Sequence, residues 1–101
     1  LVCERCHLPI ASHADKIEIG GKFEHRGANP HGFRFRFGCF AGAAGCVQSG
    51  EPSTFYSWFP GYSWQVSNCG QCGVHLGWLF RSDSGHFHAL ILDALREEPE
   101  S

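Results

Sequence analysis

Two Cys-x-x-Cys pairs far apart in the chain constrain its fold most. Cys3-Glu-Arg-Cys6 and Cys69-Gly-Gln-Cys72 are separated by 62 residues. Each short turn can aim two sulfurs at one point about 2.3 Å from a zinc ion, so the spacing favours one tetrahedral four-cysteine site. With four sulfurs and no open position, such a Zn²⁺ is structural, and its binding energy would dominate the stability of a small domain. A disulfide framework is the alternative for an even number of cysteines.

The second cysteine pair lies within an aromatic-rich stretch, residues 53–82, which holds all three tryptophans of the chain. On either side of the pair, residues 62–67 and 74–81 have the composition of extended arms. We predict that these arms form an antiparallel hairpin about the cysteines, with Trp64 opposite Gly77.

An aromatic box is predicted on one face of this hairpin. Trp78 and Phe80 are two positions apart and therefore share a face of the second arm. A tight turn at Pro60-Gly61 brings Trp58 over the same face. No Asp or Glu occurs between residues 53 and 82, so the box favours a flat, neutral ligand over a cation. The alternative is that the tryptophans form an ordinary core, but their neighbours are Gly and Ser rather than Leu and Ile, which favours a site.

Composition and charge narrow the class of protein. The 101 residues suit one domain, residues 1–101, and thirteen glycines with no methionine favour short strands and turns. A formal net charge of −2 without a basic run argues against nucleic-acid binding. No apolar stretch is long enough to span a bilayer and no secretory leader is recognisable, so we expect a cytoplasmic protein without a membrane partner. Because the chain begins at Leu1, we expect it to be trimmed.

The first half of the chain predicts short strands. Residues 16–19 and 22–26 are expected to form a small hairpin about Gly20-Gly21. Residues 27–32 are expected to be a loop. The strict alternation of Phe33-Arg-Phe-Arg-Phe37 predicts a strand with its aromatic face inward and its arginines outward.

Three later segments are less regular. Residues 41–50 are rich in Gly and Ala without a period and are expected to be a loop. The apolar run 86–92 fits either a buried strand or the start of a helix through Arg96, and periodicity does not decide between them. The acidic tail, residues 96–101, is expected to fray.

Cysteines and histidines outside the paired motifs offer no clear catalytic pattern. Cys39 and Cys46 are expected to be small buried hydrophobic residues, with a redox pair as the alternative. The seven histidines lack the spacing of a zinc-binding helix, and His86 and His88 share a strand face without a carboxylate partner. We expect the histidines to be exposed or hydrogen-bonded.

Together, several strings resemble the CULT domain, the thalidomide-binding domain of cereblon, over nearly the whole chain. They are Asn29-Pro-His-Gly-Phe33, Pro52-Ser-Thr54, Ser57-Trp-Phe-Pro-Gly-Tyr-Ser-Trp64, Cys69-x-x-Cys72 and His75-Leu-Gly-Trp-Leu-Phe80. A lone domain of this size is more similar to the single-domain bacterial relatives than to full cereblon. The resemblance implies a mostly β fold, the β-tent, in which two antiparallel sheets meet at an angle and are pinned by a four-cysteine zinc site.

The resemblance also implies a binding module rather than an enzyme. Its ligands are cyclic imides such as glutarimide and thalidomide-type drugs, uridine-like rings, and peptides that end in a cyclised imide. Three tryptophans form the cage, Phe80 closes its base, backbone groups of Tyr56 and Trp58 read the imide edge, and Asn29 reaches over the cage. The implied ligand-binding residues are Asn29, Pro30, Phe55, Tyr56, Ser57, Trp58, Trp64, Trp78 and Phe80. The implied zinc ligands are Cys3, Cys6, Cys69 and Cys72.

Departures and alternatives remain open. Tyr56 stands where human-type cereblon has His, which affects side-chain contacts more than backbone ones. The chain has no room for the regions that bind the ubiquitin-ligase adaptor. One alternative is a methionine sulfoxide reductase on the same architecture, but no Cys follows Cys72, so Cys39 or Cys46 would have to be its nucleophile. Another is a methyl-ammonium reader, which needs a carboxylate from a distant loop in the cage.

Overall fold

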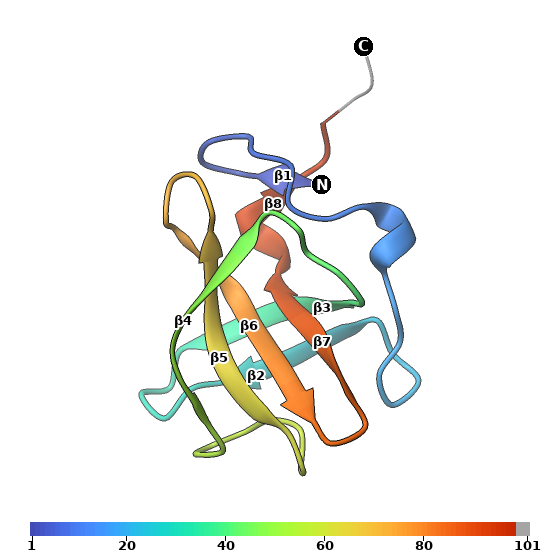
Figure 1. Ribbon diagram of the computed structural model, residues 1–101, viewed down its shortest axis with the longest axis vertical. Coiled ribbons are helices and arrows are strands. Elements are labelled where there is room, and N and C mark those ends of the chain that lie inside the picture. The colour runs from blue at the N-terminus through green and yellow to red at the C-terminus, as the bar shows by residue number, and fades with distance from the viewer. Residues whose placement is uncertain (99–101) are drawn as a thin grey trace.

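The computed structural model describes residues 1–98 and is built almost entirely of β-strands (Figure 1). No α-helix occurs in these residues, only two short 3₁₀ turns, and none of their helices could cross a membrane. The elements are β1 (Val2–Cys3), η1 (His13–Asp15), β2 (Glu24–Ala28), β3 (Arg34–Phe40), β4 (Cys46–Ser53), β5 (Ser63–Cys69), β6 (His75–Ser82), β7 (Gly85–Ile91), η2 (Leu92–Ala94) and β8 (Leu95–Arg96). Half of the tail expected to fray, residues 99–101, lies outside the described residues, and Arg96 belongs to β8.

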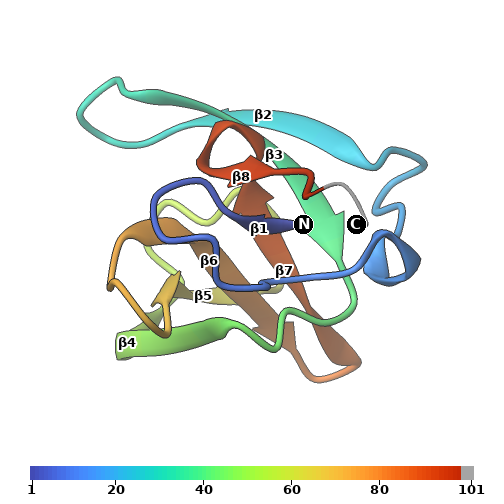
Figure 2. The ribbon, with the colours of Figure 1, turned by 90° about the horizontal axis from the view of Figure 1, so that it is seen from above.

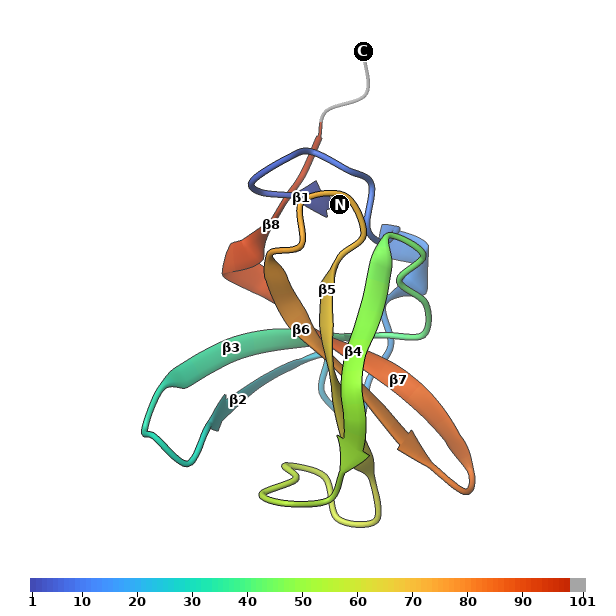
Figure 3. The same ribbon diagram turned by 60° about the vertical axis from the view of Figure 1, so that its left-hand side comes forward.

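The strands form two antiparallel sheets, as predicted. A six-stranded sheet has the order β2-β3-β7-β6-β5-β4, and β1 pairs with β8 in a second, two-stranded sheet. Figure 3 shows that the β2–β3 wing of the large sheet runs at a steep angle to the β4–β5 wing, with β6 and β7 between them. From above, β1 and β8 lie over the ends of β6 and β7, between the two wings (Figure 2). The mostly β class and its two antiparallel sheets are therefore confirmed.

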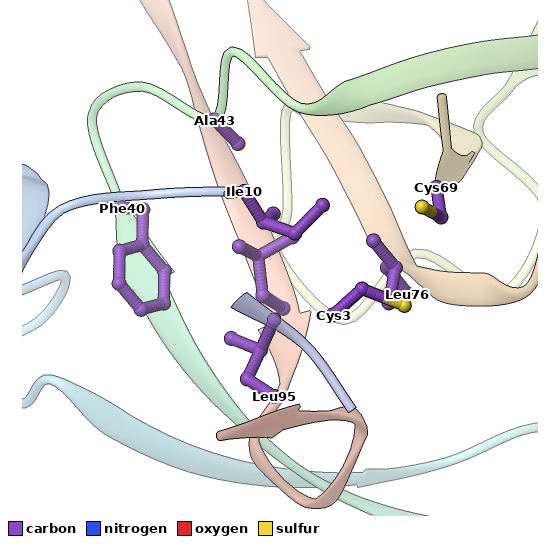
Figure 4. Close-up of a cluster of buried hydrophobic side chains, with 8 residues drawn as sticks. Cys3, Ile10, Phe40, Ala43, Cys69, Leu76 and Leu95 are labelled. Atoms are coloured by element: carbon purple, nitrogen blue, oxygen red, sulfur yellow. The ribbon is translucent and has the colours of Figure 1, made fainter. Parts of the chain in front are cut away.

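Side chains of β6 and β7 contribute to two separate clusters of the core. Leu76 and Leu90 belong to the first cluster, which also contains Cys3 and Cys69; Figure 4 shows Leu76 beside these two cysteines. Trp78 and Phe87 point into the second cluster, which is dominated by aromatic rings. In β7 the successive residues Ala89 and Leu90 face opposite sides of the sheet. In β6 the bulge before Gly77 interrupts the alternation, so Leu76 and Trp78 belong to different clusters although they are two positions apart. The β6–β7 hairpin therefore supports both the cysteine site and the aromatic site.

Three predictions about the smaller elements need correction. Residues 16–19 are not a strand; Gly20-Gly21 does form a turn, but it is closed by a single bridge between Ile19 and Lys22. The returning strand, β2, pairs instead with β3, where it gains a longer ladder. Residues 46–50, expected to be a loop, are the first part of the edge strand β4, which is mostly exposed and therefore shows no apolar period.

Other predictions for strands are confirmed or refined. The alternating run of phenylalanines and arginines forms β3, with Phe37 buried and Arg34 exposed, although Phe33 lies outside the strand and is 66% exposed. The loop expected over residues 27–32 begins two residues later, because Gly27 and Ala28 belong to β2. The apolar run 86–92 is a strand, β7.

The central hairpin is confirmed, but its predicted register is wrong. Trp64 lies opposite Phe80, and Gly77 lies opposite Ser67. The turn between the two arms is closed by a hydrogen bond from the N–H of Cys69 to the carbonyl of Val74, so it spans residues 69–74 and is not centred on the two cysteines. A β-bulge then adds one residue to β6 just before Gly77, which shifts the aromatic residues relative to β5.

Candidate functional site

The four paired cysteines meet at one point between β1 and the β5–β6 turn. All four Sγ atoms lie within 4.8 Å of one another. The Sγ atoms of Cys3 and Cys72 are 3.8 Å apart, and those of Cys6 and Cys69 are 3.5 Å apart. Sulfurs about 2.3 Å from a tetrahedral zinc ion are roughly 3.8 Å from one another, so this set has the shape to hold such an ion. All six cysteines of the chain are free, which argues against the disulfide alternative.

Both cysteine turns have the same local geometry. The residue after each pair adopts a left-handed backbone conformation, with φ of 67° at His7 and 77° at Gly73. The N–H of each donates to the carbonyl of the first cysteine of its pair, Cys3 or Cys69, at 2.9 Å. Gly takes this conformation at no steric cost, whereas His7 is held in it by the turn. The repeated geometry directs two pairs of sulfurs toward a common centre.

Backbone donors favour the ionised form of Cys69. Burial opposes ionisation of this thiol, but the N–H groups of Cys72 and Gln71 point at its Sγ, 3.5 and 3.4 Å away. Together with the neighbouring thiols they lower the pKa of Cys69 to about 6. A thiolate is the form in which cysteine binds a metal.

The two thiols outside this set are poorly suited to catalysis. Burial raises the pKa of Cys39 to about 12, and Cys39 is fully buried among aromatic residues. Burial, together with the charges of Cys69 and Cys3, raises the pKa of Cys46 to about 11. A reductase nucleophile needs a thiolate near neutral pH, and neither group provides one.

A cavity of about 170 Å³ opens between the β4–β5 loop, the β2–β3 loop and the face of β6. Both loops lie at the lower end of the molecule in Figure 3, away from the cysteine cluster. The cavity is lined by Asn29, Pro30, Phe55, Tyr56, Trp58, Trp64, Trp78 and Phe80. Eight of the nine residues predicted to bind a ligand are therefore brought together, whereas Ser57 is not part of the lining.

The tryptophans form walls of different orientation. The rings of Trp58 and Trp78 meet edge to face, with centroids 4.7 Å apart at 76°. Phe37 stacks behind Trp58 with its ring centroid 5.1 Å away and nearly parallel. The position of the Trp58 wall is thus set by the packing of Phe37 and Trp78 against it.

Two of the indole N–H groups are already hydrogen-bonded to the backbone. Trp58 Nε1 donates to the carbonyl of Ala28 at 2.9 Å, and Trp64 Nε1 donates to the carbonyl of Phe55 at 2.8 Å. Each bond ties a ring to a cavity loop and fixes its angle. These two rings can therefore offer a ligand their faces rather than their donors.

Short side chains shape the loops at the cavity mouth. Asn29 Oδ1 accepts from the N–H groups of His31 and Phe33, both at 3.0 Å, so this side chain closes its own turn. Ser57 Oγ donates to the carbonyl of Phe59 at 3.0 Å, which explains why Ser57 serves the loop rather than the lining. Tyr56 has φ of 57°, an uncommon conformation for a non-glycine residue.

His75 supports the cage from behind. Its ring lies edge-on to Trp78 with centroids 4.9 Å apart, and its Nε2–H donates to the carbonyl of Gly77 at 3.0 Å. That bond spans the bulge that precedes Trp78. Burial lowers the pKa of His75, although the bond to Gly77 opposes this effect. No role was predicted for His75 from the sequence, where only its position three residues before Trp78 could have indicated one.

Comparison with known proteins gives local matches. No model of a known protein family matches the chain. Cereblon from Gallus gallus is 46% identical over 52 residues, which is 52% of this chain and 12% of that protein. About half of this chain is thus similar in sequence to a segment of cereblon. Cereblon from Danio rerio is 42% identical over 52 residues with the same coverage, and cereblon from Drosophila melanogaster is 56% identical over 34 residues, 34% of this chain and 6% of that protein. The similarity thus spans about an eighth or less of these relatives' length.

The absence of acidic residues among the described lining of the cavity argues against the methyl-ammonium reader. None of the lining residues within residues 1–98 is acidic, so no carboxylate from a distant loop completes the cage. The walls are ring faces, and the polar groups at the mouth are amides, a phenol and backbone. This surface suits a neutral ring that carries its own hydrogen-bonding edge.

Proposed function

We propose that this protein is a binding module for cyclic imides and related rings, and not an enzyme. The observation that carries the proposal is the cavity walled by Trp58, Trp64 and Trp78 without an acidic group. Glutarimide, dihydrouracil and uridine-like rings, thalidomide-type drugs and peptides ending in a cyclised imide are the proposed ligands. The local similarity to cereblon and the resemblance to the CULT domain support this ligand class.

The backbone at the cavity mouth offers a complementary pair for an imide edge. No hydrogen bond within residues 1–98 uses the N–H of Trp58 or the carbonyl of Tyr56, two residues earlier. An imide has an N–H donor between two carbonyl acceptors. We propose that its N–H donates to Tyr56 and one of its carbonyls accepts from Trp58, while its CH₂ groups point at the tryptophan faces. A ring of roughly eight heavy atoms then binds with micromolar affinity.

The cysteine cluster is proposed to hold a structural Zn²⁺. Four sulfurs would occupy all four coordination positions of the ion, so it could not bind a substrate and would only stabilise the fold. Cys3 and Cys6 would be joined through it to the turn of the hairpin that carries Trp78. We further propose that the domain acts in the cytoplasm and is of the bacterial type.

Tryptophan fluorescence during titration with glutarimide tests the ligand class, with trimethyllysine as the parallel ligand. Saturable change with the imide alone is expected; a response to the ammonium compound alone would overturn the proposal. Trp78→Ala is expected to abolish imide binding while the metal content, measured by elemental analysis, stays unchanged. Phe33→Ala is the matched control, because Phe33 is an exposed aromatic residue outside the cavity lining. Equal affinity of Trp78→Ala and wild type would refute the site.

A further inference from the structure

Cys46, which belongs to neither cysteine pair, lies directly opposite a member of the four-cysteine cluster. In the ladder between β4 and β5, Cys46 is the register partner of Cys69. Directly opposite residues on neighbouring strands project to the same face of a sheet. The half-buried Cys46 accordingly packs against the buried cluster that contains Cys3 and Cys69 (Figure 4 shows the latter two).

The hydrogen bonds around this pair define its type. The N–H of Gly70 donates to the carbonyl of Gly45 at 2.8 Å, so the bond joins the residue after Cys69 to the residue before Cys46. This pattern makes Cys46 and Cys69 a non-hydrogen-bonded pair, in which the Cα atoms are closest, about 4.5 Å apart. Disulfides span Cα distances of about 4.4–6.8 Å, so the backbone of this pair is within range of a bond between the two sulfurs.

We propose that Cys46 and Cys69 form an oxidative switch that ejects the metal from the four-cysteine site. A peroxide is the oxidant. One of the two sulfurs attacks the peroxide, its O–O bond breaks, and a sulfenic acid forms with release of water. The second sulfur attacks the sulfenic sulfur, the S–S bond forms, the S–O bond breaks, and a second water leaves. Overall, in the zinc-loaded protein, the thiolate of Cys69, the thiol of Cys46, one hydrogen peroxide and one proton from the solvent give one disulfide and two waters.

The disulfide and the metal compete for the same sulfur. Once Cys69 is bonded to Cys46, only Cys3, Cys6 and Cys72 remain as ligands, and a three-sulfur set holds a structural ion poorly. The turn that contains Cys3 and Cys6 then loses its connection through the metal to the β5–β6 turn. The β4–β5 ladder, in contrast, gains a covalent crosslink. A thiol reductant cleaves the disulfide and restores the fourth ligand, so the switch is reversible.

The experiment treats the purified, zinc-loaded protein with hydrogen peroxide. Zinc release is followed with a chromogenic chelator, and the disulfide is mapped by mass spectrometry after alkylation and proteolysis. We expect release of one zinc per chain together with a Cys46–Cys69 crosslink, and rebinding of zinc after addition of a thiol reductant. Cys46→Ser is expected to bind zinc as wild type does but to lose the crosslink and release zinc more slowly. Cys39→Ala, which removes the other unpaired cysteine, is expected to behave as wild type.

Two outcomes would overturn the proposal. Zinc release from Cys46→Ser at the wild-type rate would show that Cys46 has no part in the loss of metal. Disulfide mapping of the oxidised wild-type protein could instead find disulfides between Cys3 and Cys6, or between Cys69 and Cys72. That result would also show that Cys46 has no part in the loss of metal. The mapping requires no variant, so it decides the question even where Cys46→Ser fails to fold. Neither result depends on imide binding.

Discussion

The indole of Trp58 lies directly on the backbone of Gly27. A Cβ atom at Gly27 would be 2.6 Å from Cε2 of Trp58 and 2.7 Å from Cδ2, closer than real side chains approach. Gly27 lies inside β2, where glycine lacks a side chain to pack and usually marks a close approach of other groups. This wall of the cage therefore depends on the absence of a side chain on a neighbouring strand.

Gly27→Ala is expected to abolish or strongly weaken ligand binding. The new methyl group must displace the Trp58 ring, and such overpacking also lowers the free energy of unfolding by about 1–3 kcal/mol. Imide titration and thermal unfolding measure the two effects. Gly42→Ala is the control, because its Cβ would meet only the side chain of Asp15, 3.4 Å from Oδ1 and 3.8 Å from Cγ, which are ordinary contacts. Unchanged affinity in Gly27→Ala would mean that Trp58 moves without consequence for the ligand.

N-methylglutarimide is expected to bind far more weakly than glutarimide. The methyl group removes the N–H that the carbonyl of Tyr56 is proposed to accept, and it leaves that acceptor unpaired in the complex. Loss of such a bond costs about 1–3 kcal/mol, or about 5- to 150-fold in affinity. Competition titration compares the two rings in the same protein. Equal affinities would place the imide edge elsewhere than at Tyr56.

Removal of the metal is expected to unfold the domain. Structural zinc contributes about 10–16 kcal/mol in small domains, which is comparable to or larger than a typical stability of about 5–15 kcal/mol. Cys6→Ser or a strong chelator should therefore abolish the cooperative thermal transition seen by near-UV circular dichroism. Cys39→Ala keeps all four ligands and should retain that transition. A preserved transition in protein shown to be metal-free would contradict a structural role for the ion.

Acidification is expected to destabilise the fold through His88. This side chain is buried, its Nδ1 has no hydrogen-bond partner within residues 1–98, and burial lowers its pKa from the ordinary 6.5. The nearby His86 and Arg81 lower it further, whereas Asp15 opposes them. As the pH falls below about 6.5, the unfolded chain takes up this proton first, so the free energy of unfolding declines; above that pH the contribution is constant.

Denaturant unfolding at a series of pH values measures this effect. His88→Leu should lose stability less steeply between neutral and acidic pH than wild type does. The exposed His31 provides the control, since His31→Leu should leave the slope unchanged. Parallel pH profiles for wild type and His88→Leu would assign the acid sensitivity to other groups, of which His75 is the next candidate because burial lowers its pKa too.

The aromatic site was predictable from sequence because its residues are concentrated. Trp58, Trp64, Trp78 and Phe80 lie within one hairpin and the loop that precedes it, so local pairing alone brings them together. The supporting contacts were not predictable in the same way. Gly27 belongs to a strand on the other wing of the sheet, and a glycine in a short segment gives no sign that a distant ring will cover it.

The incorrect predictions about the fold have similar physical causes. The register of the central hairpin depended on a bulge at residues 75–77, and a bulge leaves no mark on the alternation of neighbouring side chains. Residues 46–50 were predicted to be a loop because exposed edge strands lack a buried face, so hydrophobic periodicity cannot reveal them. The pairing of Cys46 with Cys69 became visible only with that strand in place.

The separation between the two cysteine pairs also sets the order in which the chain can fold. The β5–β6 hairpin closes over a few residues, whereas Cys6 and Cys69 have 62 residues between them. Contacts between distant segments form later than local ones, because the entropy of the long loop must be lost first. The β5–β6 hairpin, which carries Trp64 and Trp78, can therefore form before Cys3 and Cys6 reach the other two cysteines. We expect zinc capture to be the last step of folding, so that zinc supply limits how many chains finish folding rather than how they start.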